Sequence, residues 1–285
     1  MANVKRVVNP YNNHVVGEVF QAGYQDIADA IEAAEDAFQK TRQLQAYERA
    51  EILSRISLEI ESNKEKLARL ITAETGKPIT FSRAEVERSV FTFRYASEEA
   101  KRLEGAVLPL DLAPHSAYRL GIVQRFPIGV ISAITPFNFP INLVAHKLAP
   151  AIAVGNSFVL KPSSNAPLTA LMLGELILKS GYPAGAINII LCSGNEAEQL
   201  VTDQRIKLIS FTGSPAVGWP LKAKAGKKKV VLELGGNAGV IVDKDADVFS
   251  TAKRIAVGAY GNAGQSCIAV QRVFVHNEIY NGFVS

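Results

Sequence analysis

The strongest constraint on the fold of this chain is a series of short, almost wholly apolar segments that begins after residue 128. Longer helical or loop segments separate most of them. Strands that are apolar on both faces belong to parallel sheets with helices on each side, so the sequence predicts an α/β fold. Ligands bind such sheets at the carboxyl ends of the strands, and we expect functional residues just after each one. The predicted strands span residues 130–134, 157–160, 187–191, 208–211, 230–234 and 240–242.

The part of the chain before residue 128 has two other patterns. A short extended start over residues 4–19 is followed by apolar residues at helical spacing. Asp26 is the expected N-cap of the first helix, and Gly76 followed by Pro78 is the expected end of the second. Residues 107–126 alternate, are punctuated by proline and predict a β-ribbon. Helices are predicted at about 27–38, 47–75, 81–103, 141–153 and 249–260.

The composition excludes several classes of protein. Apolar residues make up 48% and charged residues 20%, as in folded proteins, and a net charge of +4 is too small to indicate disorder. No apolar stretch reaches membrane-spanning length, and the N-terminus has no signal-peptide pattern. Cys192 and Cys267 have no paired spacing, which favours a reducing compartment. We therefore expect a cytoplasmic protein.

The histidines and the longest lysine run give no specific signal. The four histidines lack the spacing of metal ligands, so no metal is expected. The lysine-rich run 222–229 is interpreted as the solvated end of a helix and a loop, with nucleic-acid binding as the less favoured alternative.

Polar residues follow three of the predicted strands, where the ligand crevice is expected. Asn138 lies among rigid proline and aromatic residues, where a held amide can donate to developing negative charge; its alternative role is a helix N-cap. Lys161 can reach ribose or phosphate oxygens, or else is a solvated charge. Gly213 and Ser214 either offer free backbone N–H groups to a pyrophosphate or form an ordinary turn, since the G-x-G-x-x-G fingerprint is absent.

Glu233 and Cys267 are the candidates for reactive chemistry. Glu233 is a lone carboxylate in the apolar strand at 230–234: if buried, it has a raised pKa suited to a general base, and otherwise it faces solvent. Cys267 lies on a glycine-rich loop, where an exposed thiol can act as a nucleophile, although most lone cysteines are small apolar core residues. Cys192, at the end of an apolar strand, is interpreted as such a core residue.

Each of these signals is weak alone, but their order along the chain resembles the aldehyde dehydrogenase superfamily. The resemblance covers essentially the whole chain. It implies a Rossmann-like parallel-sheet cofactor domain with a helical N-terminal segment, a β-ribbon oligomerisation arm and the start of an α/β catalytic domain. The matching segments are 74–78 (ETGKP), 128–130 (IGV), 135–140 (TPFNFP), 161–163 (KPS), 211–214 (FTGS), 232–236 (LELGG) and 264–267 (GQSC).

The resemblance also implies a mechanism. Cys267 attacks the aldehyde carbonyl as a thiolate, and the side chain of Asn138 and the backbone N–H of Cys267 hold the oxyanion. Hydride transfer to NAD or NADP leaves a thioester, and water activated by Glu233 releases the carboxylic acid. Lys147 matches a lysine sometimes assigned to proton relay. The parts agree with what the reaction needs: a soft nucleophile, an oxyanion donor, a hydride acceptor and a base that acts late.

The resemblance assigns a cofactor site to the strand ends. Lys161 would contact the adenosine ribose, and Gly213 and Ser214 would lie under the pyrophosphate. Ser164 stands where NAD-preferring members often have Glu, which removes the repulsion of a 2′-phosphate, so we expect NADP to be accepted. The implied cofactor-binding residues are Thr135, Pro136, Phe137, Lys161, Ser163, Ser164, Phe211, Thr212, Gly213, Ser214, Val217, Leu234 and Gly235.

The substrate is only faintly indicated. Asn142 and His146 are spaced i and i+4 on one helix face, which lines the aldehyde tunnel in the family, and they favour a short polar aldehyde such as a hydroxyaldehyde. The alternative for His146 is a satisfied core histidine. Ser266 stands where some members that bind phosphate or carboxylate have Arg, which argues against a phosphorylated substrate. Trp219-Pro220 interrupts the helix after Ser214, for a reason the sequence does not give.

The resemblance divides the chain into a cofactor domain (1–106 and 127–238), the oligomerisation arm (107–126) and an incomplete catalytic domain (239–285). It implies that the chain is a piece of a longer homodimer or homotetramer that acts on a small aldehyde, with no nucleic-acid or membrane partner. Two alternatives stay open: an NAD(P)-binding module without turnover, and a coenzyme-A-acylating enzyme. The second is disfavoured because that chemistry needs no hydrolytic base such as Glu233.

Overall fold

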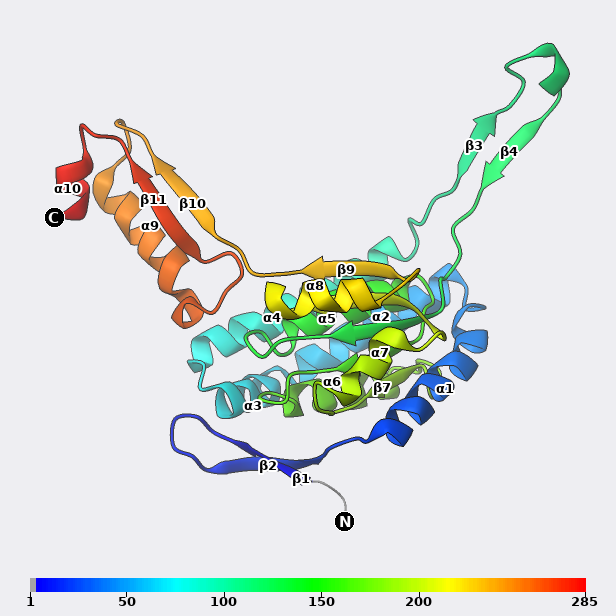
Figure 1. Ribbon diagram of the computed structural model, residues 1–285, viewed down its shortest axis with the longest axis horizontal. Helices are drawn as coiled ribbons and strands as arrows, with labels where there is room; N and C mark the ends of the chain where they lie inside the picture. Colours follow the sequence, from blue (N-terminus) through cyan, green and yellow to red (C-terminus); the bar gives the residue numbers. More distant parts are fainter. Residues whose placement is uncertain (1–3) are drawn as a thin grey trace.

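The centre of the computed structural model, which describes residues 4–285, is a parallel sheet of five strands (Figure 1). The strands are β5 (Val130–Ile134), β6 (Phe158–Lys161), β7 (Ile187–Ile189), β8 (Ile206–Thr212) and β9 (Lys229–Glu233). They lie in the order β7-β6-β5-β8-β9, and all pairings are parallel. Strand order therefore reverses between β5 and β8, which is where an open parallel sheet has its ligand crevice. The predicted α/β fold with a parallel sheet is confirmed.

Alternate side chains of the sheet enter two separate apolar cores. Ile131 and Leu160 point into one core, whereas their sequence neighbours Val130 and Val159 point into the other. The first core is covered by α2 (Ala46–Ser62), α3 (Lys64–Thr75), α4 (Ile79–Glu99), α5 (Asn142–Ala153) and α6 (Leu168–Lys179). The second is covered by α1 (Tyr24–Thr41), the short η2 (Glu196–Glu198) and α7 (Gln199–Thr202), and α8 (Pro215–Lys224). Helices on both faces leave the carboxyl edge of the sheet as the place for a ligand.

Two helix predictions are wrong in detail. The helix expected over 47–75 is two helices, α2 and α3, because the backbone leaves helical geometry at Asn63 and its side-chain amide donates to the carbonyl of Glu59 (2.8 Å). Asp26 is not the N-cap of α1. Gly23 has that position, and Asp26 accepts a hydrogen bond from its N–H (2.8 Å) from within the first turn. The predicted end of α3 at Gly76 is confirmed, with a left-handed φ of 71°.

Two antiparallel ribbons lie outside the central sheet, the first packed on the central body and the second projecting from it. β1 (Val4–Val8) pairs with β2 (Val15–Phe20), and Val7 and Val19 form a small core with Leu191. β3 (Ala106–Pro109) pairs with β4 (Leu120–Val123) through a loop that contains η1 (Pro114–Ser116), which confirms the predicted ribbon. Figure 1 shows this second ribbon projecting far from the sheet, and apolar side chains along it are exposed, Val107 by 67% and Leu120 by 66%.

Residues 238–285 form a C-terminal unit away from the sheet (Figure 1). β10 (Ala238–Val242) pairs in parallel with β11 (Val270–Val275), so the strand predicted at 240–242 pairs outside the central sheet. The unit also contains α9 (Val248–Tyr260), η3 (Gly261–Gly264) and α10 (Tyr280–Val284). Within residues 4–285, no helix is long and apolar enough to cross a membrane, and no three His, Cys, Asp or Glu side chains are grouped as metal ligands would be.

Candidate active site

A cleft of about 560 Å³ opens at the carboxyl ends of β5, β6 and β8, where strand order reverses. Segments far apart in the sequence meet here because neighbouring parallel strands end at the same edge. Phe137 borders a smaller neighbouring cavity with Ser164 and Gln265, whereas Leu234 and Gly235 do not line the cleft. The predicted cofactor residues that line the cleft are Thr135, Pro136, Lys161, Ser163, Ser164, Phe211, Thr212, Gly213, Ser214 and Val217.

Lys161 supplies a cation to the cleft. It is the last residue of β6 and is half-buried. Burial lowers the pKa of its ammonium group; the charge of Lys5 acts in the same direction, and Cys192 acts against both. The loop that follows adds the hydroxyl groups of Ser163 and Ser164, and Ser163 Oγ accepts a hydrogen bond from the N–H of Asn165 (3.2 Å). This side of the cleft suits a ligand rich in oxygen atoms.

Phe211 fixes the turn after β8. A Cβ on Gly213 would lie 2.5 Å from the Phe211 ring, so only glycine fits without a shift. The N–H of Gly213 donates to the carbonyl of Glu233 (3.0 Å) and is not free, which corrects the expectation that it is available to a pyrophosphate. Ser214 precedes α8, so the first turn of that helix is the part that presents a positive dipole end to the cleft.

The cleft lining also includes residues that were missed or left without a role by the sequence, among them Glu198, Lys224 and Pro220. Glu198 and Lys224 both line the cleft and form an ion pair (2.7 Å) between η2 and α8. Lys224 belongs to the lysine run interpreted as a solvated surface, and Glu198 lies in no motif. Pro220, within α8, also lines the cleft, which gives the Trp219-Pro220 pair a place although not a function.

Asn138 connects the sheet edge to the loop of Cys267. Its Nδ2 donates to the carbonyl of Gln265 (2.8 Å), and its Oδ1 is buried with no hydrogen-bond partner in the described chain. The N-cap alternative is wrong, because α5 starts at Asn142 with Ile141 before it. An amide held in this way retains a second N–H for another acceptor.

Cys267 is exposed, as a nucleophile must be, and Cys192 is buried in the second core as predicted. The loop before Cys267 is tightly bent: Asn262, Ala263 and Gly264 all have left-handed φ values, 53°, 56° and 72°. Gly236, from the LELGG segment, packs directly on this loop. A Cβ at Gly236 would overlap the carbonyl oxygen of Cys267, so the second glycine of the motif is needed for that close approach.

The prediction that Glu233 is a buried carboxylate is wrong, and its solvent-facing alternative holds. β9 is an edge strand whose residues alternate between exposed and half-buried, and Glu233 is exposed. Its charge still reaches α5, where it raises the pKa of Lys147 and of His146 against the effect of burial. An exposed carboxylate at this position has access to water.

α5 carries the remaining predicted residues in three different environments. Lys147 is buried and donates to Ser210 Oγ (3.0 Å); burial lowers its pKa to about 8. Asn142 is buried, and its Oδ1 has no partner within residues 4–285. His146 is exposed, so the core-histidine alternative is wrong, and partial burial followed by the charge of Arg88 lowers its pKa. Ser266 Oγ accepts from the N–H of Ile268 (3.4 Å) beside Cys267.

Known proteins resemble this chain in sequence and fold. The chain is 43% identical over 285 residues to a 3-sulfolactaldehyde dehydrogenase of Priestia aryabhattai, matching 100% of this chain and 59% of that protein. An aldehyde dehydrogenase of Physcomitrella patens, solved in complex with the reaction product succinate, superimposes with a TM-score of 0.96 at 45% identity, over 99% of this chain and 59% of that one. A glyceraldehyde-3-phosphate dehydrogenase of Methanocaldococcus jannaschii complexed with NADP gives a TM-score of 0.93 at 38% identity, over 100% of this chain and 62% of that one.

These relatives agree with the match of a family model to the chain. The chain spans about three fifths of the length of the relatives it matches. The family model, described as the aldehyde dehydrogenase family, matches residues 2–285 of the sequence. This chain belongs to the aldehyde dehydrogenase family.

Proposed function

We propose that the protein oxidises a short polar aldehyde to the carboxylic acid with NADP or NAD, through a thioester on Cys267. The observation that carries the proposal is the hydrogen bond from Asn138 Nδ2 to the carbonyl of Gln265 (2.8 Å). It joins the candidate oxyanion donor to the loop of the candidate nucleophile. The joined groups lie at the edge of the sheet that also holds the cleft.

The cleft fits a dinucleotide in its donor set. Lys161 and the serine hydroxyls lie on one side, the first turn of α8 on the other, and Val217 and Leu221 add apolar surface for a base. Glu198 is a carboxylate on the lining, but its pairing with Lys224 offsets its charge. With Ser164 in place of an acidic residue, this lining does not repel a 2′-phosphate. When bound, the nicotinamide ring accepts a hydride.

The chain's own residues supply the other steps. Cys267 Sγ, as a thiolate, forms a bond to the aldehyde carbon while the carbonyl electrons move to oxygen. The free N–H of the Asn138 amide and the backbone N–H of Cys267 are the donors for that oxygen. After the hydride leaves, Glu233 takes a proton from water, the hydroxide adds to the thioester carbonyl, and Cys267 departs as a thiolate. This base explains why we favour hydrolysis over transfer to coenzyme A.

The aldehyde is proposed to be small and polar. The names and titles of the three relatives refer to a sulfonated aldehyde, a phosphorylated aldehyde and the product succinate, all short and polar. His146 and the cation of Arg88 lie close enough for Arg88 to lower the pKa of the imidazole. Both are exposed, and two groups of this kind suit a hydroxyl or anionic substituent better than a fatty chain.

The domains, the subunit assembly and the location of the protein follow from the same assignment. Residues 1–106 and 127–238 would form the cofactor domain, 107–126 the arm and 239–285 part of the catalytic domain. The exposed apolar side chains of β3 and β4 suit an arm that packs on another subunit, in a homodimer or homotetramer. A cytoplasmic location agrees with the free thiols of Cys192 and Cys267.

The test is turnover by the purified protein with a short hydroxyaldehyde and either NADP or NAD, followed as reduced cofactor. Cys267→Ala should abolish turnover, whereas Cys192→Ala, the matched control, should retain it. Comparable kcat/KM values for the two cofactors, or a preference for NADP, would support the role of Ser164; strict use of NAD would contradict it. Cofactor binding without turnover by the wild type would instead favour the binding-module alternative.

A further inference from the structure

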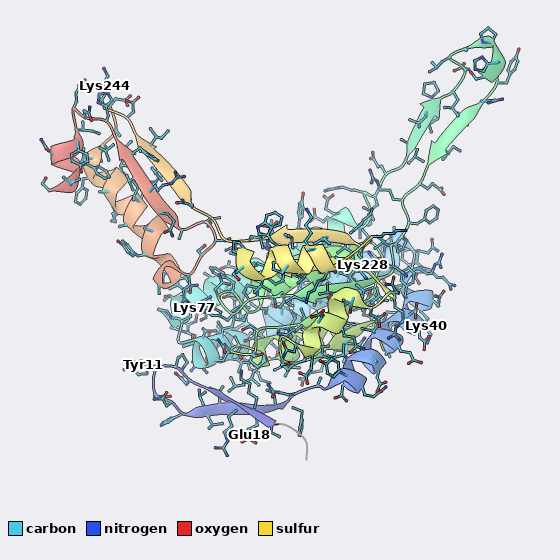
Figure 2. All side chains as sticks on the ribbon, in the orientation of Figure 1. Tyr11, Glu18, Lys40, Lys77, Lys228 and Lys244 are labelled. Carbon is cyan, nitrogen blue, oxygen red and sulfur yellow. The ribbon has the colours of Figure 1, made fainter. Side chains whose placement is uncertain are left out.

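A buried ion pair lies directly behind the Asn138 turn. Lys77 Nζ is 2.5 Å from Glu85 Oε2, and the two side chains are 3% and 1% exposed. Lys77 belongs to the ETGKP segment between α3 and α4, and Glu85 lies on α4. Figure 2 labels Lys77 at the end of the central body that lies next to the C-terminal unit.

The two side chains of the ion pair form hydrogen bonds with both ends of the turn that carries Asn138. At one end, Lys77 Nζ donates to the backbone carbonyl of Asn138 (2.7 Å) and lies 4.3 Å from the centre of the Phe139 ring. At the other end, Glu85 Oε1 accepts from the N–H groups of Ile141 (3.1 Å) and Asn142 (3.2 Å). These two N–H groups are at the start of α5 and have no partner within that helix.

The Asn138 turn is hydrogen-bonded to the loop that carries Cys267. Besides the bond from Asn138 Nδ2 to the carbonyl of Gln265, the side chain of Asn262 donates to the backbone carbonyls of both Asn138 and Gln265 (3.3 Å each). The carbonyl of Asn138 is therefore shared between Lys77 and Asn262. A continuous set of hydrogen bonds runs from Glu85 through Lys77 and the Asn138 turn to the segment just before Cys267.

Stability does not explain why an ion pair occupies this place. Taking both charges out of water costs about as much as their attraction returns, and well-packed apolar pairs of similar volume are often as stable. Burial outweighs even the attraction of Lys77 and raises the pKa of Glu85. The pair instead fixes the conformation of one short turn, because it hydrogen-bonds three of the turn's backbone groups.

We propose that Lys77 and Glu85 are positioning residues that fix the Asn138 turn and, through it, the approach of Asn138 to Cys267. The inference rests on the proposed function for its effect on turnover, and on the hydrogen bonds alone for its effect on the turn. Neither side chain is assigned contact with the aldehyde or the cofactor.

The test compares two double variants with the wild type. Lys77→Met with Glu85→Gln removes both buried charges, keeps similar volumes and leaves an acceptor for the N–H groups of α5. The control is Glu65→Gln with Arg83→Met, which removes an exposed ion pair (2.9 Å) between α3 and α4. Each protein is measured for kcat, for the KM of the cofactor and for amide hydrogen exchange, after circular dichroism has confirmed folding.

We expect kcat to fall about 100-fold in the buried-pair variant, because a displacement near 1 Å costs about that factor, with the cofactor KM changed less than about threefold. Exchange should increase in residues 138–143 and 261–267 and stay unchanged in β8. The control variant should match the wild type in all three measurements. Single Lys77→Met, which leaves Glu85 unpaired, is avoided because it risks unfolding.

Two results would overturn the proposal. Unchanged exchange over 138–143 would show that the pair does not hold the turn, and increased exchange with unchanged kcat would show that holding it does not matter for the reaction. A wild type without turnover would refute the proposed function instead. In that case the exchange measurement alone decides whether Lys77 and Glu85 hold the turn.

Discussion

The central body and the C-terminal unit are built by different means. α5, in the central body, buries most of its residues between the sheet and α2 and α4, whereas α9 (Val248–Tyr260) has no buried residue. The cleft residues therefore stand on two filled cores, and Cys267 stands on a loop held by a few hydrogen bonds and one close backbone approach. Stability should depend on the first region, and the geometry of the nucleophile on local contacts in the second.

The largest effect should come from matched phenylalanines in the two regions. Phe158 is fully buried on β6, and Phe249 on α9 is 81% exposed. Phe158→Ala should lower the free energy of unfolding by about 3–5 kcal/mol, because it leaves a cavity in a close-packed core. Phe249→Ala should change it by no more than about 0.5 kcal/mol. Urea unfolding of both variants checks this, and equal losses would contradict the contrast between the regions.

The central body should also contain a group, Glu74, whose contribution to the free energy of unfolding depends on pH. Glu74 is buried and its carboxylate caps the start of α6, accepting from the N–H groups of Leu168 (2.9 Å) and Thr169 (3.0 Å). Burial raises its pKa to about 7, with the charge of Glu85 adding to the shift and the hydrogen bonds from Thr169 and Leu168 opposing it. A pKa raised by folding means that the folded protein holds a proton that the unfolded chain has already lost.

The stability that Glu74 contributes should therefore be complete below about pH 4 and be lost as pH rises through about 7. The difference in unfolding free energy between wild type and Glu74→Gln should fall by about 3 kcal/mol from pH 4.5 to pH 8, at 1.36 kcal/mol per pKa unit. Urea titrations at several pH values measure it. A difference that stays flat would show that folding leaves the pKa of Glu74 unchanged, and one that grows with pH would show that folding lowers it; either result would contradict the prediction.

Just before the C-terminal unit, one added methyl group at Gly236 should disturb the loop of the nucleophile. A Cβ on Gly236 overlaps the carbonyl oxygen of Cys267, so Gly236→Ala must shift the loop. We expect kcat to fall about 100-fold with little change in the unfolding of the central body. Gly261→Ala is the matched control in the same loop region, because no atom lies within 4 Å of its Cβ and its φ is −53°. Equal kcat values for the two variants would refute the role of the close approach.

The same contrast explains which features the sequence could predict. Strands that are apolar on both faces can be predicted from the sequence because every position in them is constrained. The order of the motifs that follow these strands identified Asn138, Lys161 and Cys267 as candidate site residues. The exposure of Glu233 could not be predicted, because an edge strand such as β9 packs on fewer neighbours than its apolar composition suggests. The ETGKP segment matched as a motif but without a role.

The reason is that the contacts of Glu74, in this segment, and of Glu85, the ion-pair partner of its Lys77, are distant in the sequence. Glu74 binds the N–H of Leu168, 94 positions away, and Glu85 binds the N–H of Ile141, 56 positions away. No local pattern encodes such a pairing, since the helical spacing of α4 only shows which face is inside. The amide of Gly213 was misjudged for a similar reason, because its partner is a carbonyl on the neighbouring strand.

The smallest effect concerns Lys147, which belongs to the well-packed region and feels the charge of Glu233. Burial lowers its pKa to about 8, and its Nζ donates to Ser210 Oγ (3.0 Å). A pKa lowered by folding means that the neutral amine, able to accept a proton, becomes populated as pH rises through 8. If Lys147 relays the proton, kcat should rise across that range in the wild type and stay flat in Lys147→Met, with a loss of about fivefold at pH 9.

Ser210→Ala supplies the control for this assignment. Removing the hydroxyl takes away an acceptor that favours the charged ammonium, so the rise in kcat should move to lower pH and persist. A rise that remains in Lys147→Met would assign the titration to another group, and His146, whose pKa is also lowered, would not fit a midpoint near 8. A packed lysine would then have no part in the chemistry, and the catalytic steps would rest on Cys267, Asn138 and the exposed Glu233.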